Sequence, residues 1–137
     1  MFVDASAIVA ITTREPGAKA LADALNRARS PITSALAMFE AALAIRRKQQ
    51  STVAEAEADV AEFLAAAGIR IVPLTGDEAA AALSAFARYG KGQGHPAQLN
   101  LGDCFTYAVA RTHGTSLLFA GADFAHTDIP PAASATT

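Results

Sequence analysis

The chain opens with a short apolar run, Met1 to Val3, that ends in the carboxylate of Asp4, and a helical pattern follows from Ala5. A buried strand of a parallel sheet has this form, because it is apolar along its length and carries chemistry at its carboxyl end. An ionised carboxylate is costly to bury without a partner. Asp4 alone could simply cap the following helix, but three later acids occupy comparable positions and favour a shared site.

Short apolar segments alternate with helical patterns along the rest of the chain. Further strands are expected at residues 32–33, 69–74 and 116–120, with a last edge strand starting at Ile129 and stopped by Pro130 and Pro131. Helices are expected over residues 6–11, 16–29, 35–49, 52–68 and 78–89, and from the first turn at Asp103 to Gly114. This order predicts an α/β domain with a mainly parallel sheet over residues 1–131, followed by a flexible tail, residues 132–137.

The helix expected over residues 35–49 carries an apolar stripe. Leu36, Phe39 and Leu43 share one side of it, which predicts that this side is buried and that Phe39 belongs to the core. Glu40 follows Phe39 directly and therefore lies at the edge of the expected buried side.

Most of the thirteen acids have ordinary interpretations as surface or capping residues. Four do not, because each lies at the end of an apolar strand or among apolar helical positions. These four are Asp4, Glu40, Asp103 and Asp123. Asp128 could support the same site, although Asp is a common turn residue and a structural role is the simpler interpretation.

Four clustered carboxylates would repel one another, which raises their pKa values and destabilises the fold. A bound divalent cation removes that penalty, and oxygen ligands of this kind suit Mg²⁺ or Mn²⁺. Two such ions can activate a water and stabilise the leaving oxygen of a phosphodiester. The chain has no set of cysteine and histidine ligands with fixed spacing, so zinc is not expected.

Composition bounds the setting in which such a site would work. The net charge of −2 gives no general basic surface for nucleic acid, but a metal-filled acidic site would bring its own positive charge. Cys104 is the only cysteine, which excludes an internal disulfide and suits a reducing cytoplasm. The apolar start contains Asp4 and lacks a leading basic residue, so it is a poor signal peptide, and no apolar run is long enough for a membrane span.

Four segments, taken together and in this order, resemble a known family. They are Met1-Phe2-Val3-Asp4-Ala5-Ser6, residues 33–42 around Glu40, residues 99–105 around Asp103, and residues 118–124 ending in Asp123-Phe124. Over nearly its whole length the chain resembles a PIN-domain ribonuclease of the VapC toxin type. The resemblance implies a three-layer α/β/α fold and a Mg²⁺- or Mn²⁺-dependent endoribonuclease. It also implies a cognate VapB-type antitoxin and a homodimer.

The resemblance also implies roles for individual residues. By position, Asp4, Glu40, Asp103 and Asp123 would be the catalytic, metal-binding acids, and Ser6 a hydrogen-bond partner of that site. The chain departs from the family at Ala122, where relatives commonly carry Asn or Asp.

Other interpretations stay open on sequence alone. An aspartyl-phosphate-type phosphatase also places an Asp after its first strand, although its usual second Asp is replaced here by Ser6. A non-catalytic PIN-like binding module would keep the scaffold without the chemistry, and the presence of all four acids disfavours it. The basic residues 46–48 could contact RNA or simply end a solvated helix, and the helices at 18–25 and 35–43 could form a groove for the antitoxin.

Overall fold

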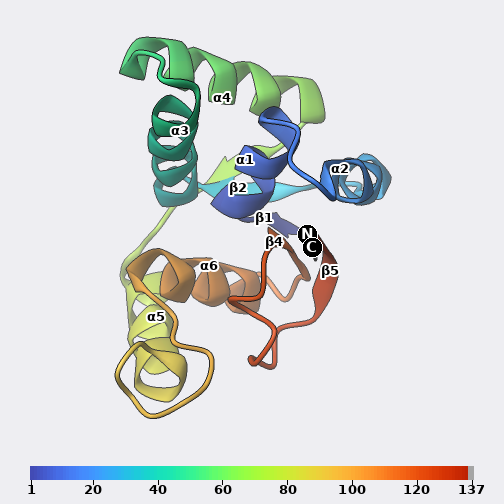
Figure 1. The fold of residues 1–137 in the computed structure, drawn as a ribbon. Coiled ribbons are helices and arrows are strands. Elements are labelled where there is room, and N and C mark those ends of the chain that lie inside the picture. Colours follow the sequence, from blue (N-terminus) through green and yellow to red (C-terminus); the bar gives the residue numbers. More distant parts are fainter. Residues whose placement is uncertain (136–137) are drawn as a thin grey trace.

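A five-stranded sheet forms the centre of the computed structural model, which describes residues 1–135 (Figure 1). The strands lie in the order β3-β2-β1-β4-β5, and every neighbouring pair is parallel. Their bounds are β1 Phe2–Val3, β2 Ile32–Ser34, β3 Arg70–Val72, β4 Leu117–Ala120 and β5 Pro131–Ala135. The α/β class and the parallel sheet expected from the sequence are thus confirmed.

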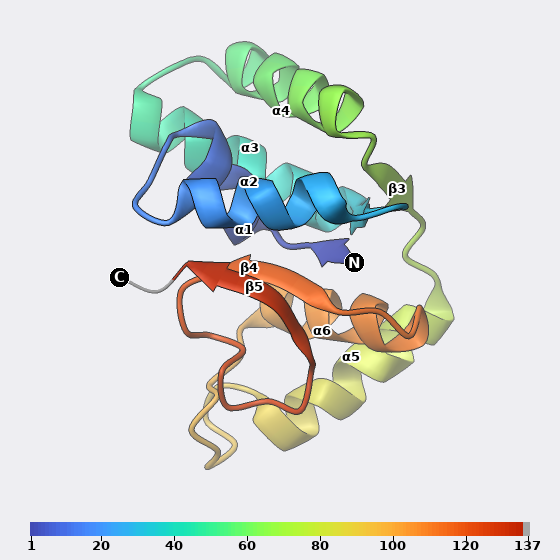
Figure 2. The same ribbon diagram turned by 90° about the vertical axis from the view of Figure 1, so that its right-hand side faces the viewer.

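Helices cover both sides of this sheet (Figure 2). On one side lie α1 Ala5–Thr12, α2 Ala18–Arg27, α3 Ala35–Gln49 and α4 Val53–Ala67, and on the other lie α5 Gly76–Tyr89 and α6 Leu101–Thr112. Successive strand residues point to opposite faces. Accordingly, Val3 and Leu118 belong to the core under α1 to α4, whereas Phe2 and Leu117 belong to the core over α5 and α6. The expected three-layer arrangement is confirmed.

The order of the strands creates a topological switch point between β1 and β4, at the carboxyl ends of these strands. From β1 the chain proceeds through helices on one face to β2 and β3, and it then returns through α5 and α6 on the other face to β4, on the far side of β1. Ligands of open α/β sheets bind at such a switch point, outside the carboxyl ends of the strands. Asp4 directly follows β1, and Gly121 to Asp123 directly follow β4.

The buried side of α3 differs from the one predicted. Ala37, Ala41 and Ile45 are buried, whereas Phe39 is 60% exposed and Leu43 is 41% exposed. Helix α3 packs against both α1 and α4, and small alanine side chains allow these helices to approach closely. The larger apolar side chains are therefore left on the outside, and the core role predicted for Phe39 is wrong.

The end of the chain also differs from the prediction. Residues Pro131–Ala135 form β5, which pairs with β4 from Leu117 to Ala120, so the flexible tail predicted from residue 132 is wrong as far as residue 135. A proline is tolerated as the first residue of an edge strand, and the carbonyl of Pro130 accepts a hydrogen bond from Leu117 N at 3.0 Å. Residues 136–137, the rest of that predicted tail, lie outside the described residues.

Helix α2 is not available for the groove expected over residues 18–25. Its apolar side chains Leu21 and Leu25 are buried in the core beneath it.

None of the helices in residues 1–135 combines the length and apolar character that a membrane crossing requires.

Candidate functional site

Asp4 is held rigidly at the carboxyl end of β1. It is buried, with 6% of its surface exposed, and both carboxylate oxygens accept hydrogen bonds. Oδ2 accepts from Ser6 N at 3.0 Å and from Ser6 Oγ at 2.5 Å, and Oδ1 accepts from Thr106 Oγ1 at 2.8 Å. Asp4 therefore caps α1, as its local sequence allows, and is also fixed in orientation by a second helix, α6.

Ser6 connects Asp4 to the neighbouring strand. While its hydroxyl donates to Asp4, its Oγ accepts a hydrogen bond from Ala120 N at 3.0 Å, at the last residue of β4. The ends of β1 and β4 are thus joined through one side chain, in the position that the sequence assigned to a hydrogen-bond partner of the site.

Asp103 lies in the first turn of α6. Its backbone N donates to Asn100 Oδ1 at 2.9 Å, and its Oδ2 accepts from Asn100 N at 3.1 Å, which makes a capping box. This arrangement fixes the start of α6 and orients the Asp103 carboxylate. The side chain is only half-buried, so it remains accessible to a ligand.

The pKa values of Asp103 and Glu40 are raised by burial and, in part, by the charges of the other acids predicted from the sequence. Burial is the main cause that raises the pKa of Asp103 to about 7, with the Asn100 hydrogen bond opposing the shift and the charges of Asp123, Asp4 and Glu40 adding to it. Burial, and then the charge of Asp4, likewise raises the pKa of Glu40. Residues from four separate parts of the chain therefore lie within electrostatic reach of one another.

Glycine at position 102 makes room for Glu40. A Cβ added to Gly102 would overlap the Glu40 carboxylate, with both carboxylate oxygens and Cδ as its nearest neighbours. Glu40 from α3 therefore lies directly against the first turn of α6, next to Asp103. This close approach requires a residue without a side chain.

Asp123 completes the group from the segment after β4. It is exposed, and the chain reaches it through Gly121, whose φ of +90° lies in the left-handed region that favours glycine. Ala122, the position where the chain departs from the family, is also exposed in this turn.

Asp128 is placed elsewhere. Its carboxylate accepts a hydrogen bond from the Tyr107 hydroxyl and pairs with Arg88 Nη1 at 3.4 Å and Arg111 Nη1 at 4.0 Å. These contacts hold the pKa of Asp128 below its usual range, with the Tyr107 hydrogen bond as the largest cause. The structure therefore does not bring Asp128 to the four acids, and the supporting role considered for it is replaced by a structural one.

The donor set fits a hard divalent cation. All four candidate ligands are carboxylates, as Mg²⁺ and Mn²⁺ prefer, and their mutual repulsion gives a cation a favourable place. Within residues 1–135 no three His, Cys, Asp or Glu side chains are already arranged closely enough to hold a metal ion. The structure thus provides the ligand types and places Glu40 against Gly102, next to Asp103, without a preformed ligand set among the described residues.

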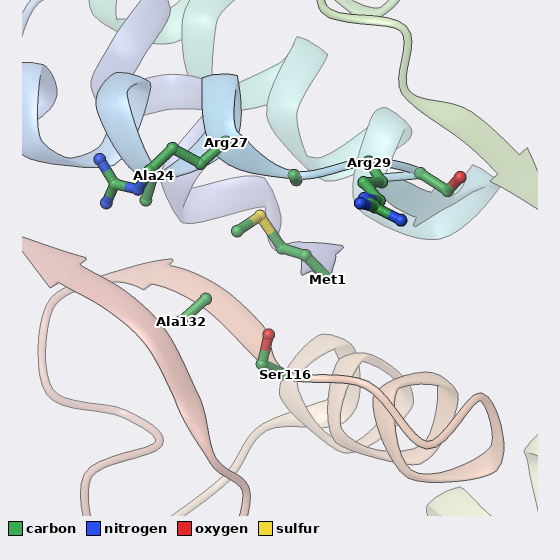
Figure 3. Close-up of a pocket in the computed structure, with 8 residues that line it drawn as sticks. Met1, Ala24, Arg27, Arg29, Ser116 and Ala132 are labelled. Carbon is green, nitrogen blue, oxygen red and sulfur yellow. The ribbon is translucent and has the colours of Figure 1, made fainter.

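Two hollows lie at opposite ends of the strands. One, of about 430 Å³, starts at Ser6 and Glu40 and extends to Ala44 and Arg47 on α3. The other, of about 400 Å³, lies at the amino ends of the strands, between Met1 and Ser116 (Figure 3). Its two arginines, Arg27 and Arg29, point away from each other, and none of the four acids lines it.

Three residues of the site were not found from the sequence. Thr106 binds Asp4. Asn100 caps α6, and Gly102 makes room for Glu40. Asn100 could have been found, because Asn followed by an acid three residues later is a capping signal. Thr106 lies three residues after Asp103 on the same side of the helix, but nothing local indicates its partner 102 residues away.

Comparisons with known proteins identify relatives of the chain. The sequence profile of the PIN domain matches residues 1–130. Ribonuclease VapC42 of Mycobacterium tuberculosis strain H37Rv is 42% identical over 132 residues, which cover 96% of this chain and 98% of that protein. A VapC ribonuclease of Rhizobium meliloti strain 1021 is 40% identical over 139 residues, covering 93% and 98%.

A solved structure shares the fold. The crystal structure of Mycobacterium tuberculosis VapC20, described as a toxin that cleaves the sarcin-ricin loop, matches with a TM-score of 0.73 and covers 93% of this chain and 95% of that one. The identity is 20%, so this likeness supports the architecture alone.

Proposed function

Because the chain belongs to the PIN-domain family of VapC ribonucleases, we propose that it is an endoribonuclease whose active site is the group Asp4, Glu40, Asp103 and Asp123. The observation that carries this proposal is the convergence of these acids at the switch point of the sheet, where Asp4 is bound by Thr106 of α6 and the Glu40 carboxylate lies against Gly102, next to Asp103. In addition to burial, the charges of the other three acids contribute to the raised pKa of Asp103. The relatives named above supply the reaction class, which is cleavage of phosphodiester bonds in RNA.

The acids would hold Mg²⁺ or Mn²⁺. When bound, such an ion lowers the pKa of an attacking water and neutralises charge on the scissile phosphate. Ser6 and Thr106 fix the Asp4 carboxylate, so its free electron pairs point in a defined direction. Asn100 does the same for Asp103. The protein thus supplies carboxylate oxygens in fixed positions. Without a bound ion, the repulsion between these carboxylates lowers the stability of the fold.

A phosphatase that uses Asp4 as a nucleophile is a weaker alternative. Both oxygens of Asp4 already accept hydrogen bonds, and Ser6 occupies the place of the second Asp such enzymes use. A non-catalytic module would not need four acids brought together from four separate parts of the chain. The nuclease is therefore the function that the geometry supports best.

Cleavage of total RNA by purified protein tests the proposal. With Mg²⁺ or Mn²⁺, wild type should cleave at defined positions, whereas Asp4→Asn and Asp103→Asn should lose about a hundredfold or more in rate and remain folded by circular dichroism. Asp128→Asn is the matched control and should cleave, because this acid lies outside the group. Full activity of Asp103→Asn would refute the site.

We also propose the setting that the family implies, namely a VapB-type antitoxin, a homodimer and a cytoplasmic location with a single reduced cysteine. Exposed apolar side chains offer surfaces for protein partners. Phe39 and Leu43 line a hollow of about 270 Å³ between α3 and α4, and Leu83 and Leu101 line one of about 400 Å³ between α5 and α6.

Light scattering and co-purification test these partners. The protein should elute at twice the mass of the chain, and it should bind the product of an adjacent small open reading frame. Phe39→Ser should weaken that binding, because helix-in-groove partners anchor on exposed apolar residues. A monomeric protein would refute the dimer, and unchanged binding by Phe39→Ser would remove α3 as the antitoxin surface.

A further inference from the structure

The hollow beside the acidic group extends along α3 and ends at the side chain of Arg47. Its lining includes Ser6, Glu40, Ala44, Arg47 and Gly121. We propose that this hollow holds the RNA strand next to the reacting phosphate, and that Arg47 binds a neighbouring phosphate group. The proposal rests on RNA being the substrate and adds where the strand runs and which residue grips it.

Helix geometry places Arg47 on the same side of α3 as Glu40. The two residues are seven positions apart, which is close to two full turns and about 10 Å along the helix axis. Ala44 lies between them and also lines the hollow, and its small side chain leaves the path open. Long side chains on a helix lean toward its amino end, so Arg47 leans toward Glu40.

The charge balance leaves Arg47 available. Its neighbour Lys48 is engaged, with Nζ at 2.7 Å from Glu15 Oε1 and 2.8 Å from Thr13 Oγ1. Glu15 also lines the hollow, and Lys48 balances its charge. Arg47 forms no ion pair among residues 1–135, so it contributes an uncompensated positive charge to the lining of the hollow.

The chemistry of Arg47 matches a phosphodiester. A guanidinium presents a planar fork of donors that binds two phosphate oxygens together. The chain has a net charge of −2 and concentrates acids at the site, so RNA would be repelled there without a nearby cation. A cation two turns from Glu40 compensates that repulsion along the path of the strand.

Binding of a short fluorescein-labelled oligouridylate, followed by anisotropy over a range of salt concentrations, tests the proposal. The measurement uses full-length Asp4→Asn protein, so that the strand is not cleaved, and compares it with the same protein carrying Arg47→Gln or Arg46→Gln. Arg46 is the matched control, since it is also exposed at this helix end but does not line the hollow.

Arg47→Gln should weaken binding about tenfold. It should also lower the slope of log affinity against log salt by about 0.7, the value for one lost phosphate contact on a single strand. Arg46→Gln should change neither quantity, and Arg47→Lys should restore the slope. In otherwise wild-type protein, Arg47→Gln should raise KM for RNA and leave kcat nearly unchanged.

Equal affinity and equal salt slope for Arg47→Gln and Arg46→Gln would overturn the proposal. So would unchanged RNA affinity combined with lost inhibition by the antitoxin, because Arg47 would then belong to the protein interface. Failure of the proposed function is a separate outcome, since in that case wild-type protein itself would cleave no RNA with Mg²⁺ or Mn²⁺.

Discussion

At the scale of single residues, Asp103 has a charge that depends strongly on its surroundings. Burial and three neighbouring carboxylates raise its pKa from 3.8 to about 7. Between those two values the folded chain holds a proton that the unfolded chain releases, so this group lowers the stability of the fold as the pH rises across that window. A cation that replaces the proton should reverse the loss.

Thermal melting with and without Mg²⁺ checks this pH dependence. In chelator, wild type should melt at a lower temperature at about pH 8 than at about pH 6, and Mg²⁺ should raise the melting temperature more at the higher pH. Asp103→Asn should melt at a similar temperature at both pH values. A wild-type protein whose Mg²⁺ effect is larger at low pH would contradict the electrostatic account.

Gly102 and Glu40 make a second prediction at this scale. Gly102→Ala should displace the Glu40 carboxylate, because the new Cβ occupies its place, and RNA cleavage should fall at least about tenfold. Stability should change little, since the far end of a flexible side chain can move. Gly76→Ala is the control, because a Cβ there meets nothing within 4 Å, and it should retain full activity.

At the scale of elements, the start of α6 has two tasks. Its capping box stabilises the helix and orients Asp103, whereas the Thr52–Glu55 box of α4 only stabilises a helix that carries none of the four acids. Asn100→Ala and Thr52→Ala should each cost about 1 kcal/mol in the free energy of unfolding. Only Asn100→Ala should also reduce RNA cleavage, and equal activities of the two variants would separate the cap from the site.

Local patterns predicted the elements well where local physics decides them. The start of α4 and the apolar strand before Asp4 could be predicted, because the residues that determine them lie within a few positions of each other. The buried side of α3 could not, because the choice of Ala41 over Phe39 depends on how closely α1 and α4 approach. The last strand was predicted at Ile129 and expected to stop at Pro130 and Pro131, whereas β5 runs from Pro131 to Ala135. It was misplaced for a similar reason, since its hydrogen bonds come from β4 and its own sequence is poor in strand formers.

The residues of the site likewise fall into those that could be predicted from the sequence and those that could not. The four acids could be selected because each looks out of place locally, and a known family pattern ordered them. Thr106 could not, since its partner Asp4 is brought to it only by the packing of α6 on β1. Asp128 shows that residue type alone does not identify a site residue. Its carboxylate contacts Tyr107, Arg88 and Arg111 instead.

At the scale of the whole molecule, the sheet topology assembles the site. Acids at positions 4 and 123 follow the two strands on either side of the switch point, and those at 40 and 103 come from helices on opposite faces of the sheet. The fold therefore brings negative charges together at the expense of stability. A divalent cation that binds only the folded chain should stabilise it by RT ln(1 + c/Kd), where c is the free cation concentration, so the gain rises with the logarithm of c once this exceeds Kd.

The most direct test of this central claim is a calorimetric titration of Mn²⁺ into wild-type, Asp4→Asn, Asp103→Asn and Asp128→Asn proteins. The account predicts that wild type and Asp128→Asn bind Mn²⁺ with the same affinity, and that Asp4→Asn and Asp103→Asn bind it at least about tenfold more weakly. Undiminished Mn²⁺ affinity in both Asp4→Asn and Asp103→Asn would contradict the claim that these acids share a metal ion.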